Sequence, residues 1–196
     1  MGAALRRCVA LAGLAVLAAC TADQSGVRDW SIQAREAVLP PTVSRAAPAV
    51  ADPAPGAPAD SATVLREAAG AWLAVLGALA DDATPPDPGT TLEARAAVLA
   101  ATDPGAAADA ANLARAVGYV AQRGWSAAHL AYAVNYGDPF FQAVIARLGP
   151  QPLAQRVGAG HGVLMERRDI LGQADTGRIM RAEASELRRL MARPAP

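Results

Sequence analysis

Residues 61–80 read SATVLREAAGAWLAVLGALA, and their large apolar side chains recur at the spacing of one helix face. That stripe consists of Leu65, Trp72, Val75, Leu76 and Leu79. Asp60 or Ser61 supplies a side-chain oxygen of the kind that caps the first turn of a helix. The pattern therefore predicts a helix from this cap to about Ala80, ending before the Pro85-Pro86 pair.

The same signals recur further along the chain. Thr90 and Glu93 fit a capping box, in which each side chain satisfies a backbone N–H at the helix start. Asp103-Pro104 and Asp138-Pro139 both place a capping aspartate before a proline, which is tolerated at the first helical position. The predicted helices are Thr90 to about Ala101, 104–122, Ser126 to about Asn135, 139–148, Pro152 to about Leu171, and Asp175 or Thr176 to Ala192.

The fold class that these periods predict is all-α. No segment shows a sustained alternation of apolar and polar residues of the strand type. Residues 61–193 suffice for one core, and short connections favour antiparallel neighbours. We therefore expect a single compact bundle of about six or seven helices.

Residues 20–60 have a different composition, with small residues separated by prolines. Such a segment predicts a disordered Pro/Ala-rich tether, because a polyproline path extends about 3.1 Å per residue. Residues 40–60 alone would then hold the domain up to about 60 Å from an anchor at the N-terminus. One short helix, Trp30 to Leu39 with Asp29 as its cap, interrupts the tether; it would lie on the membrane or dock on the domain, and we favour docking.

The N-terminus has the layout of a secretion signal. Arg6 and Arg7 precede twelve uncharged, mostly apolar residues, 8–19. A membrane-spanning helix needs about 20 such residues, so this stretch is too short to span and is expected to be cleaved.

The end of this segment, Leu17-Ala18-Ala19-Cys20, resembles the lipobox of bacterial lipoproteins. The resemblance implies cleavage before Cys20, lipid attachment to its thiol, and a membrane as partner. In that family an aspartate after the cysteine favours retention in the inner membrane, and here the residue is Thr21. The resemblance therefore implies the periplasmic face of the outer membrane; the alternative is an ordinary signal peptide cut after a small residue.

Cysteine and charge content exclude several classes of protein. Cys8 would leave with the signal peptide and Cys20 would carry lipid, which leaves no cysteine for a disulfide or a thiolate metal site. The chain has 18 basic and 18 acidic residues, so removal of Arg6 and Arg7 leaves 16 against 18. A slightly acidic mature chain gives no indication of a nucleic-acid partner.

Candidate chemistry is sparse. Residues 158–162, GAGHG, match neither a P-loop nor a dinucleotide fingerprint. Ala154, Gly158 and Gly162 are interpreted as a small face for helix packing, with a helix break as the alternative. His129 and His161 lack zinc-site spacing, so we expect no metal and no cofactor, and interpret them as buried or boundary histidines with a satisfied hydrogen bond. Ser126 lies in no nucleophile elbow and is interpreted as a helix cap. We therefore expect no enzymatic activity.

Six of the eight aromatic residues lie between positions 119 and 141: Tyr119, Trp125, Tyr132, Tyr136, Phe140 and Phe141. Such clustering fits either a folding nucleus or a recognition patch. We expect both Phe residues, with Leu130 and Val134, to lie in the core. His129, Tyr132 and Tyr136 share one helical face and are predicted to border a groove as the binding surface.

The function that these features favour is a non-catalytic interaction or structural module of the cell envelope, anchored through Cys20, with an envelope protein as a further possible partner. The second hypothesis is a helical bundle that binds a small apolar ligand, and an enzyme comes third. A ligand binder requires a pocket with convergent polar groups, whereas an interaction module requires a solid core and an exposed apolar patch.

Overall fold

Helices account for most of the chain in the computed structural model, which describes residues 23–39 and 60–193. This part holds seven α-helices and two short 3-10 helices and contains no strand, which confirms the all-α prediction. In chain order the elements are α2 (Ser25–Val38), α4 (Ser61–Ala80), α5 (Gly89–Leu99), α6 (Pro104–Gln122), η1 (Ala127–His129), α7 (Leu130–Arg147), α8 (Pro152–Glu166), η2 (Arg168–Ile170) and α9 (Ala174–Met191).

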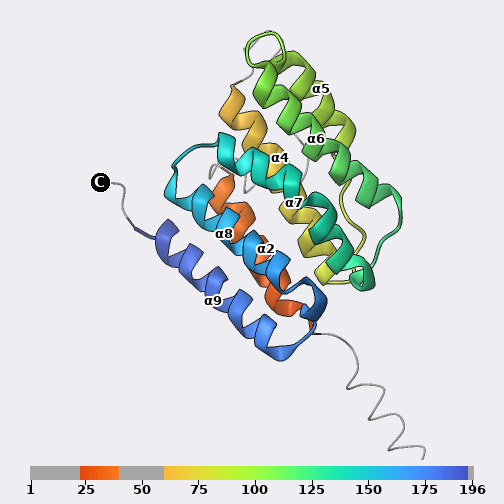
Figure 1. The fold of residues 1–196 in the computed structure, drawn as a ribbon, viewed down its shortest axis with the longest axis vertical. Helices are drawn as coiled ribbons and strands as arrows, with labels where there is room; N and C mark the ends of the chain where they lie inside the picture. Colours follow the sequence, from red (N-terminus) through yellow and green to blue (C-terminus); the bar gives the residue numbers. More distant parts are fainter. Residues whose placement is uncertain (1–22, 40–59, 194–196) are drawn as a thin grey trace, which may run out of the picture.

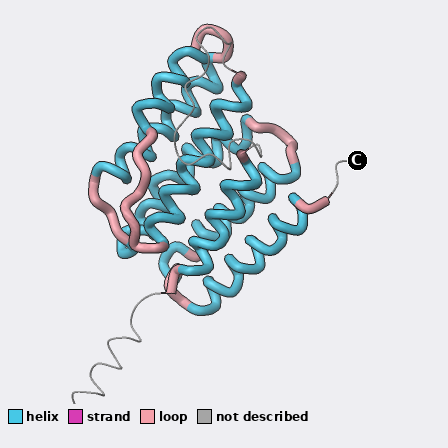
Figure 2. Tube along the Cα trace, turned by 180° about the vertical axis from the view of Figure 1, so that it is seen from behind, coloured by secondary structure: helices cyan, strands magenta, loops and turns pink. Residues whose placement is uncertain are grey.

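The helices pack around α4, which contacts α2, α6 and α7 (Figure 1). On one side α5 and α6 form a helical hairpin, and on the other α8 and α9 pack with α2. The view from behind shows the same arrangement, with the connections gathered at the ends of the helices (Figure 2).

The central position of α4 explains its composition. Ten of its residues are buried, including Trp72, Leu73 and Leu76, which are wholly inaccessible to solvent. By length and hydropathy alone α4 is also the one helix of the described residues that would qualify to span a membrane. A helix that is apolar on most of its surface is equally what the core of a bundle requires.

The N-terminal helix α2 docks on the bundle, as we favoured. Trp30 is fully buried, and the backbone of Gly26 approaches α9 so closely that a Cβ there would lie 2.3 Å from the carbonyl oxygen of Gly177. The helix begins at Ser25, five residues before the predicted start. Asp29 therefore lies inside the helix, where it pairs with Arg28 at 3.1 Å instead of capping.

Docking of α2 changes the organisation expected of residues 20–60. Only residues 21–24 separate Cys20 from the first packed helix. Residues 40–59 lie outside the described residues and connect α2 to α4, which are packed against each other. Because α2 is part of the bundle, residues 40–60 do not separate the bundle from the predicted anchor at Cys20.

The two aspartate-proline signals have different outcomes. Asp103 caps α6 as predicted, its Oδ1 accepting from the N–H of Ala106 at 2.9 Å. The predicted start at Asp138-Pro139 is wrong, because α7 runs without a break from Leu130 to Arg147 and contains Pro139. Pro139 lies on the exposed side of the helix, where water can satisfy the carbonyl that loses its N–H partner.

Two other helix ends also differ from the prediction. The Thr90 capping box does not form, because α5 already begins at Gly89, whose N–H donates to Asp87 Oδ1 at 3.1 Å. The helix predicted from Pro152 to Leu171 ends at Glu166, and the separate turn η2 follows.

Candidate functional site

One end of the bundle gathers the aromatic side chains that are not fully buried. The chain leaves α6, turns at Gly124, whose φ of 64° is in the left-handed region, and enters η1 and then α7. Glycine adopts such a φ without steric cost. The turn places Trp125 between the last turn of α6 and the first turn of α7, next to Tyr119 and Tyr132.

A capping box fixes the local backbone at η1. Ser126 accepts a hydrogen bond from the backbone N–H of His129, and the His129 Nδ1 accepts from the N–H of Ser126 at 3.3 Å. Ser126 therefore caps a helix start, as predicted. The serine hydroxyl also lies 3.3 Å from Nδ1, but that nitrogen already accepts the backbone bond, so the pair serves the cap.

Trp125 is the centre of the aromatic contacts. Its ring is stacked on His129 with a centroid distance of 5.8 Å, and meets Tyr132 edge-on at 5.1 Å. Tyr119 approaches it edge-on at 5.7 Å from α6. Edge-to-face pairs of this kind contribute about 0.5–1.5 kcal/mol beyond the area they bury.

The cluster continues along α7. Tyr136 packs on Tyr119 at 4.9 Å and on Phe140 at 5.9 Å, and the guanidinium of Arg123 lies 4.4 Å above the Tyr119 ring. Tyr132 remains 56% exposed. We call this surface the aromatic end; it consists of Tyr119, Arg123, Trp125, His129, Tyr132 and Tyr136.

The three residues nominated from the sequence thus lie in one cluster, but not on their own. His129 and Tyr132 both touch Trp125, and Tyr136 is joined to them through Tyr119. The helical face of α7 does not predict that Tyr119 and Trp125 belong to the same surface, because the turn at 123–126 brings α6 beside α7.

The core members of the cluster are largely those expected. Leu130, Val134 and Phe141 are fully buried. Phe140 is only partly buried, which corrects its assignment to the core. Phe140 lies one position before Phe141 on α7, and its ring packs against Tyr136.

Apart from the aromatic end, a buried polar network links three helices in the core. His161 of α8 is wholly inaccessible; its Nε2 accepts from Trp72 Nε1–H of α4 at 3.2 Å. Nδ1 must then carry the ring proton, and it donates to Asp138 Oδ1 of α7 at 3.0 Å. This bond holds the pKa of Asp138 below its ordinary value. The interpretation of His161 as a buried histidine with satisfied hydrogen bonds is confirmed.

The glycine run 158–162 forms part of a continuous helix and permits close packing around this network. A Cβ at Gly160 would lie 2.4 Å from Trp30 Nε1, and one at Gly158 would lie 2.8 Å from Ile145 Cγ2. A Cβ at Gly162 would have no neighbour within 4 Å. The predicted small face is therefore real at Gly158 but does not extend to Gly162.

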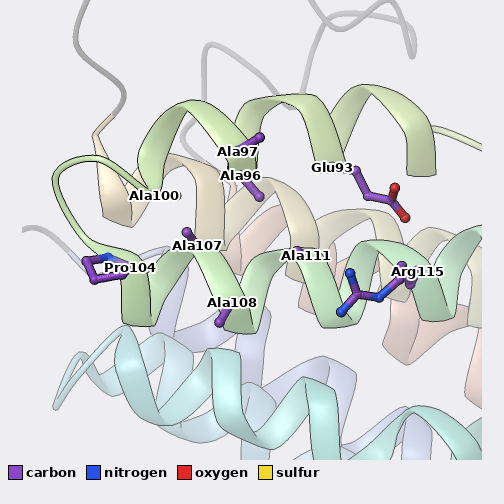
Figure 3. A pocket seen from close by; sticks show the side chains of 9 residues that line it. All are labelled: Glu93, Ala96, Ala97, Ala100, Pro104, Ala107, Ala108, Ala111 and Arg115. Atoms are coloured by element: carbon purple, nitrogen blue, oxygen red, sulfur yellow. The ribbon is translucent and has the colours of Figure 1, made fainter.

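Two hollows lie away from the aromatic end. A depression of about 390 Å³ separates α5 from α6, with six alanines along its walls and Glu93 and Arg115 at one end (Figure 3). A second, of about 470 Å³, is lined by Asp109, Ala143, Ala146 and Arg147. Both open widely to solvent.

Two further observations complete the description of candidate sites. Within residues 23–39 and 60–193, no group of three or more histidine, cysteine, aspartate or glutamate side chains is placed to hold a metal ion. Cys20, the predicted lipid attachment site, lies outside the described residues.

No family model matches the chain, and no curated protein or solved structure is significantly similar to it.

Proposed function

We propose that this chain is an envelope lipoprotein, held at the periplasmic face of the outer membrane by acyl chains on Cys20, whose helical bundle acts as a non-catalytic interaction module. Its binding surface is the aromatic end. The observation that carries the proposal is that the exposed rings of Tyr132 and His129 both pack on the partly buried Trp125 at one end of the bundle. Tyrosine and tryptophan supply large contact area at a small cost in side-chain entropy, which is why they dominate binding surfaces.

The roles of the two histidines support a module without catalysis. His161 has both ring nitrogens bonded inside the core, and His129 uses Nδ1 in the cap of η1. The hollow between α5 and α6 also favours an interaction module over a small-ligand binder, because its alanine walls are open to solvent and polar groups occur only at one end. Ligand sites instead enclose most of the ligand surface.

The anchor is tested by intact-mass spectrometry of the membrane-extracted protein. We expect a mature N-terminus at Cys20 with acyl chains attached, and an uncleaved or released product for Cys20→Ser. An unmodified N-terminus at another residue would show that the anchor is absent.

The binding surface is tested by replacing Tyr132 with a photo-crosslinking amino acid in living cells. Val98, which is 65% exposed near the end of α5, provides the matched control because it is solvent-facing but remote from the aromatic end. We expect crosslinked species at position 132 and not at position 98. Equal yields at both positions would contradict the assignment of the surface.

A further inference from the structure

The aromatic end lies next to the start of α2, and so next to the predicted anchor. Gln24, the residue before α2, donates from Nε2 to the carbonyl of Ala127 in η1 at 3.2 Å. The N–H of Ala127 donates to Asp82 Oδ1 at 3.0 Å, and Arg28 bonds Asp81 at 3.1 Å. The start of α2, the end of α4 and the start of α7 therefore meet at one end of the bundle.

The chain between this end and Cys20 is short. Cys20 and Ser25, the first residue of α2, are five residues apart, and five residues span at most about 18 Å even when fully extended. Acyl chains on Cys20 would lie in the hydrocarbon, which puts the cysteine itself at the headgroup layer. That layer occupies about 5–8 Å on each side of a bilayer. The anchor would thus keep the start of α2 within about 18 Å of the headgroup layer.

The chemistry of the aromatic end suits this position. Tryptophan and tyrosine concentrate at the headgroup level of membranes because each ring has an apolar body and one polar group. Trp125 and Tyr132 lie two and five residues from Ala127, which carries the bond to Gln24. Arg123, stacked over Tyr119, adds a long side chain that can keep its charge among the headgroups.

Arginine pairs with some of the nearby carboxylates, while Asp23, Asp82 and Asp87 accept hydrogen bonds from backbone or amide N–H groups, so the surface is not basic. Asp81 pairs with Arg28, and across the base of α9 Asp175 pairs with Arg167 at 3.0 Å. Attraction to the membrane would then depend on aromatic insertion and on the anchor more than on net charge.

We infer that the partner of the aromatic end is the phospholipid surface of the membrane that holds the anchor, with Trp125 and Tyr132 seated in the headgroup layer. This inference rests on the proposed lipidation of Cys20. It assigns the bundle one fixed orientation, in which the aromatic end faces the lipid and the α5–α6 connection faces away.

Tryptophan fluorescence provides the test, because Trp30 and Trp72 are fully buried while Trp125 is partly exposed. Acylated full-length mature protein is reconstituted in vesicles of phosphatidylethanolamine and phosphatidylglycerol whose acyl chains carry bromine near the glycerol. We expect bromine to remove the Trp125 contribution, measured as the difference between the wild-type protein and Trp125→Phe. The residual emission of Trp125→Phe should be the same in brominated and plain vesicles.

A matched control is Val98→Trp in the Trp125→Phe background, which moves the reporter to the far end of α5; its fluorescence should not change with bromination. Vesicle-bound, acylated protein in which Trp125 is unquenched would overturn the inference and leave the anchor intact. Equal quenching at positions 98 and 125 would overturn it too, because the bundle would have no fixed orientation. Protection of Trp125 from acrylamide in cell envelopes but not in vesicles would assign the surface to a protein partner instead. A mature protein without acyl chains would overturn both proposals, and intact mass identifies that case.

Discussion

At the scale of single residues, Asp138 holds the buried histidine in one tautomer. Because Trp72 donates to Nε2, His161 must donate from Nδ1, and Asp138 accepts that bond at 3.0 Å. A buried N–H left without an acceptor costs about 1–3 kcal/mol. We expect Asp138→Ala to lower the free energy of unfolding by about that amount in urea titrations. Asp138→Asn, which keeps an acceptor oxygen, should lose less.

The same variant pair predicts a pH dependence. The bond from His161 lowers the pKa of Asp138 in the folded state. A lowered folded-state pKa contributes stability that is fully present above the unfolded value, about 4, and is lost as the pH falls through the folded value. The stability advantage of the wild-type protein over Asp138→Ala should therefore shrink only below about pH 4. An advantage that stays constant into strong acid would contradict this origin.

Sequence reasoning at this scale succeeded where a residue's role depends on its own helix. Leu130, Val134 and Phe141 follow the periodicity of α7 and are buried, and Ser126 caps its turn. The bond between Trp72 and His161 spans 89 positions and forms because the packing of α4 and α8 brings these two side chains together. The local pattern of either helix does not predict that contact.

At the scale of an element, α8 carries two glycines with opposite roles. A Cβ at Gly160 would collide with the buried ring of Trp30, whereas one at Gly162 would meet nothing. Overpacking a core costs about 1–3 kcal/mol, while alanine in a helix interior is about 0.5–1 kcal/mol better than glycine. We expect Gly160→Ala to lower the thermal midpoint and Gly162→Ala to raise it. Two variants with equal midpoints would show that α8 does not seat against α2 as described.

Helix starts show the limit of local signals. Asp103-Pro104 and Asp138-Pro139 have the same chemistry, yet only the first begins a helix. The carboxylate of Asp103 caps its own helix through Oδ1 while Oδ2 accepts from Ser61 of α4 at 3.0 Å, whereas that of Asp138 bonds a histidine from another helix. The sequence alone does not say whether such a carboxylate turns to its own backbone, to another helix or to both.

At the scale of the whole molecule, the bundle depends on a helix that lies beyond a proline-rich segment. Trp30 is fully buried, and truncation of such a ring costs about 3–5 kcal/mol, against a total stability of about 5–15 kcal/mol for a typical domain. We expect a chain that begins at Asp60 to lose its cooperative thermal transition, measured by circular dichroism. The control begins at residue 20 with Cys20→Ser and should melt cooperatively; equal midpoints would mean that α2 is dispensable.

The contact between α2 and α9 also sets the order in which the chain is completed. Arg181 donates to Ser25 across 156 positions of sequence, so the first helix of the described residues is covered by the last. In an exported chain the N-terminus crosses the membrane first, and until α9 follows it the apolar face of α2 has no complete cover. During that interval Trp30 is a target for chaperones that recognise exposed apolar segments. Arrival of α9 is then the event that protects α2.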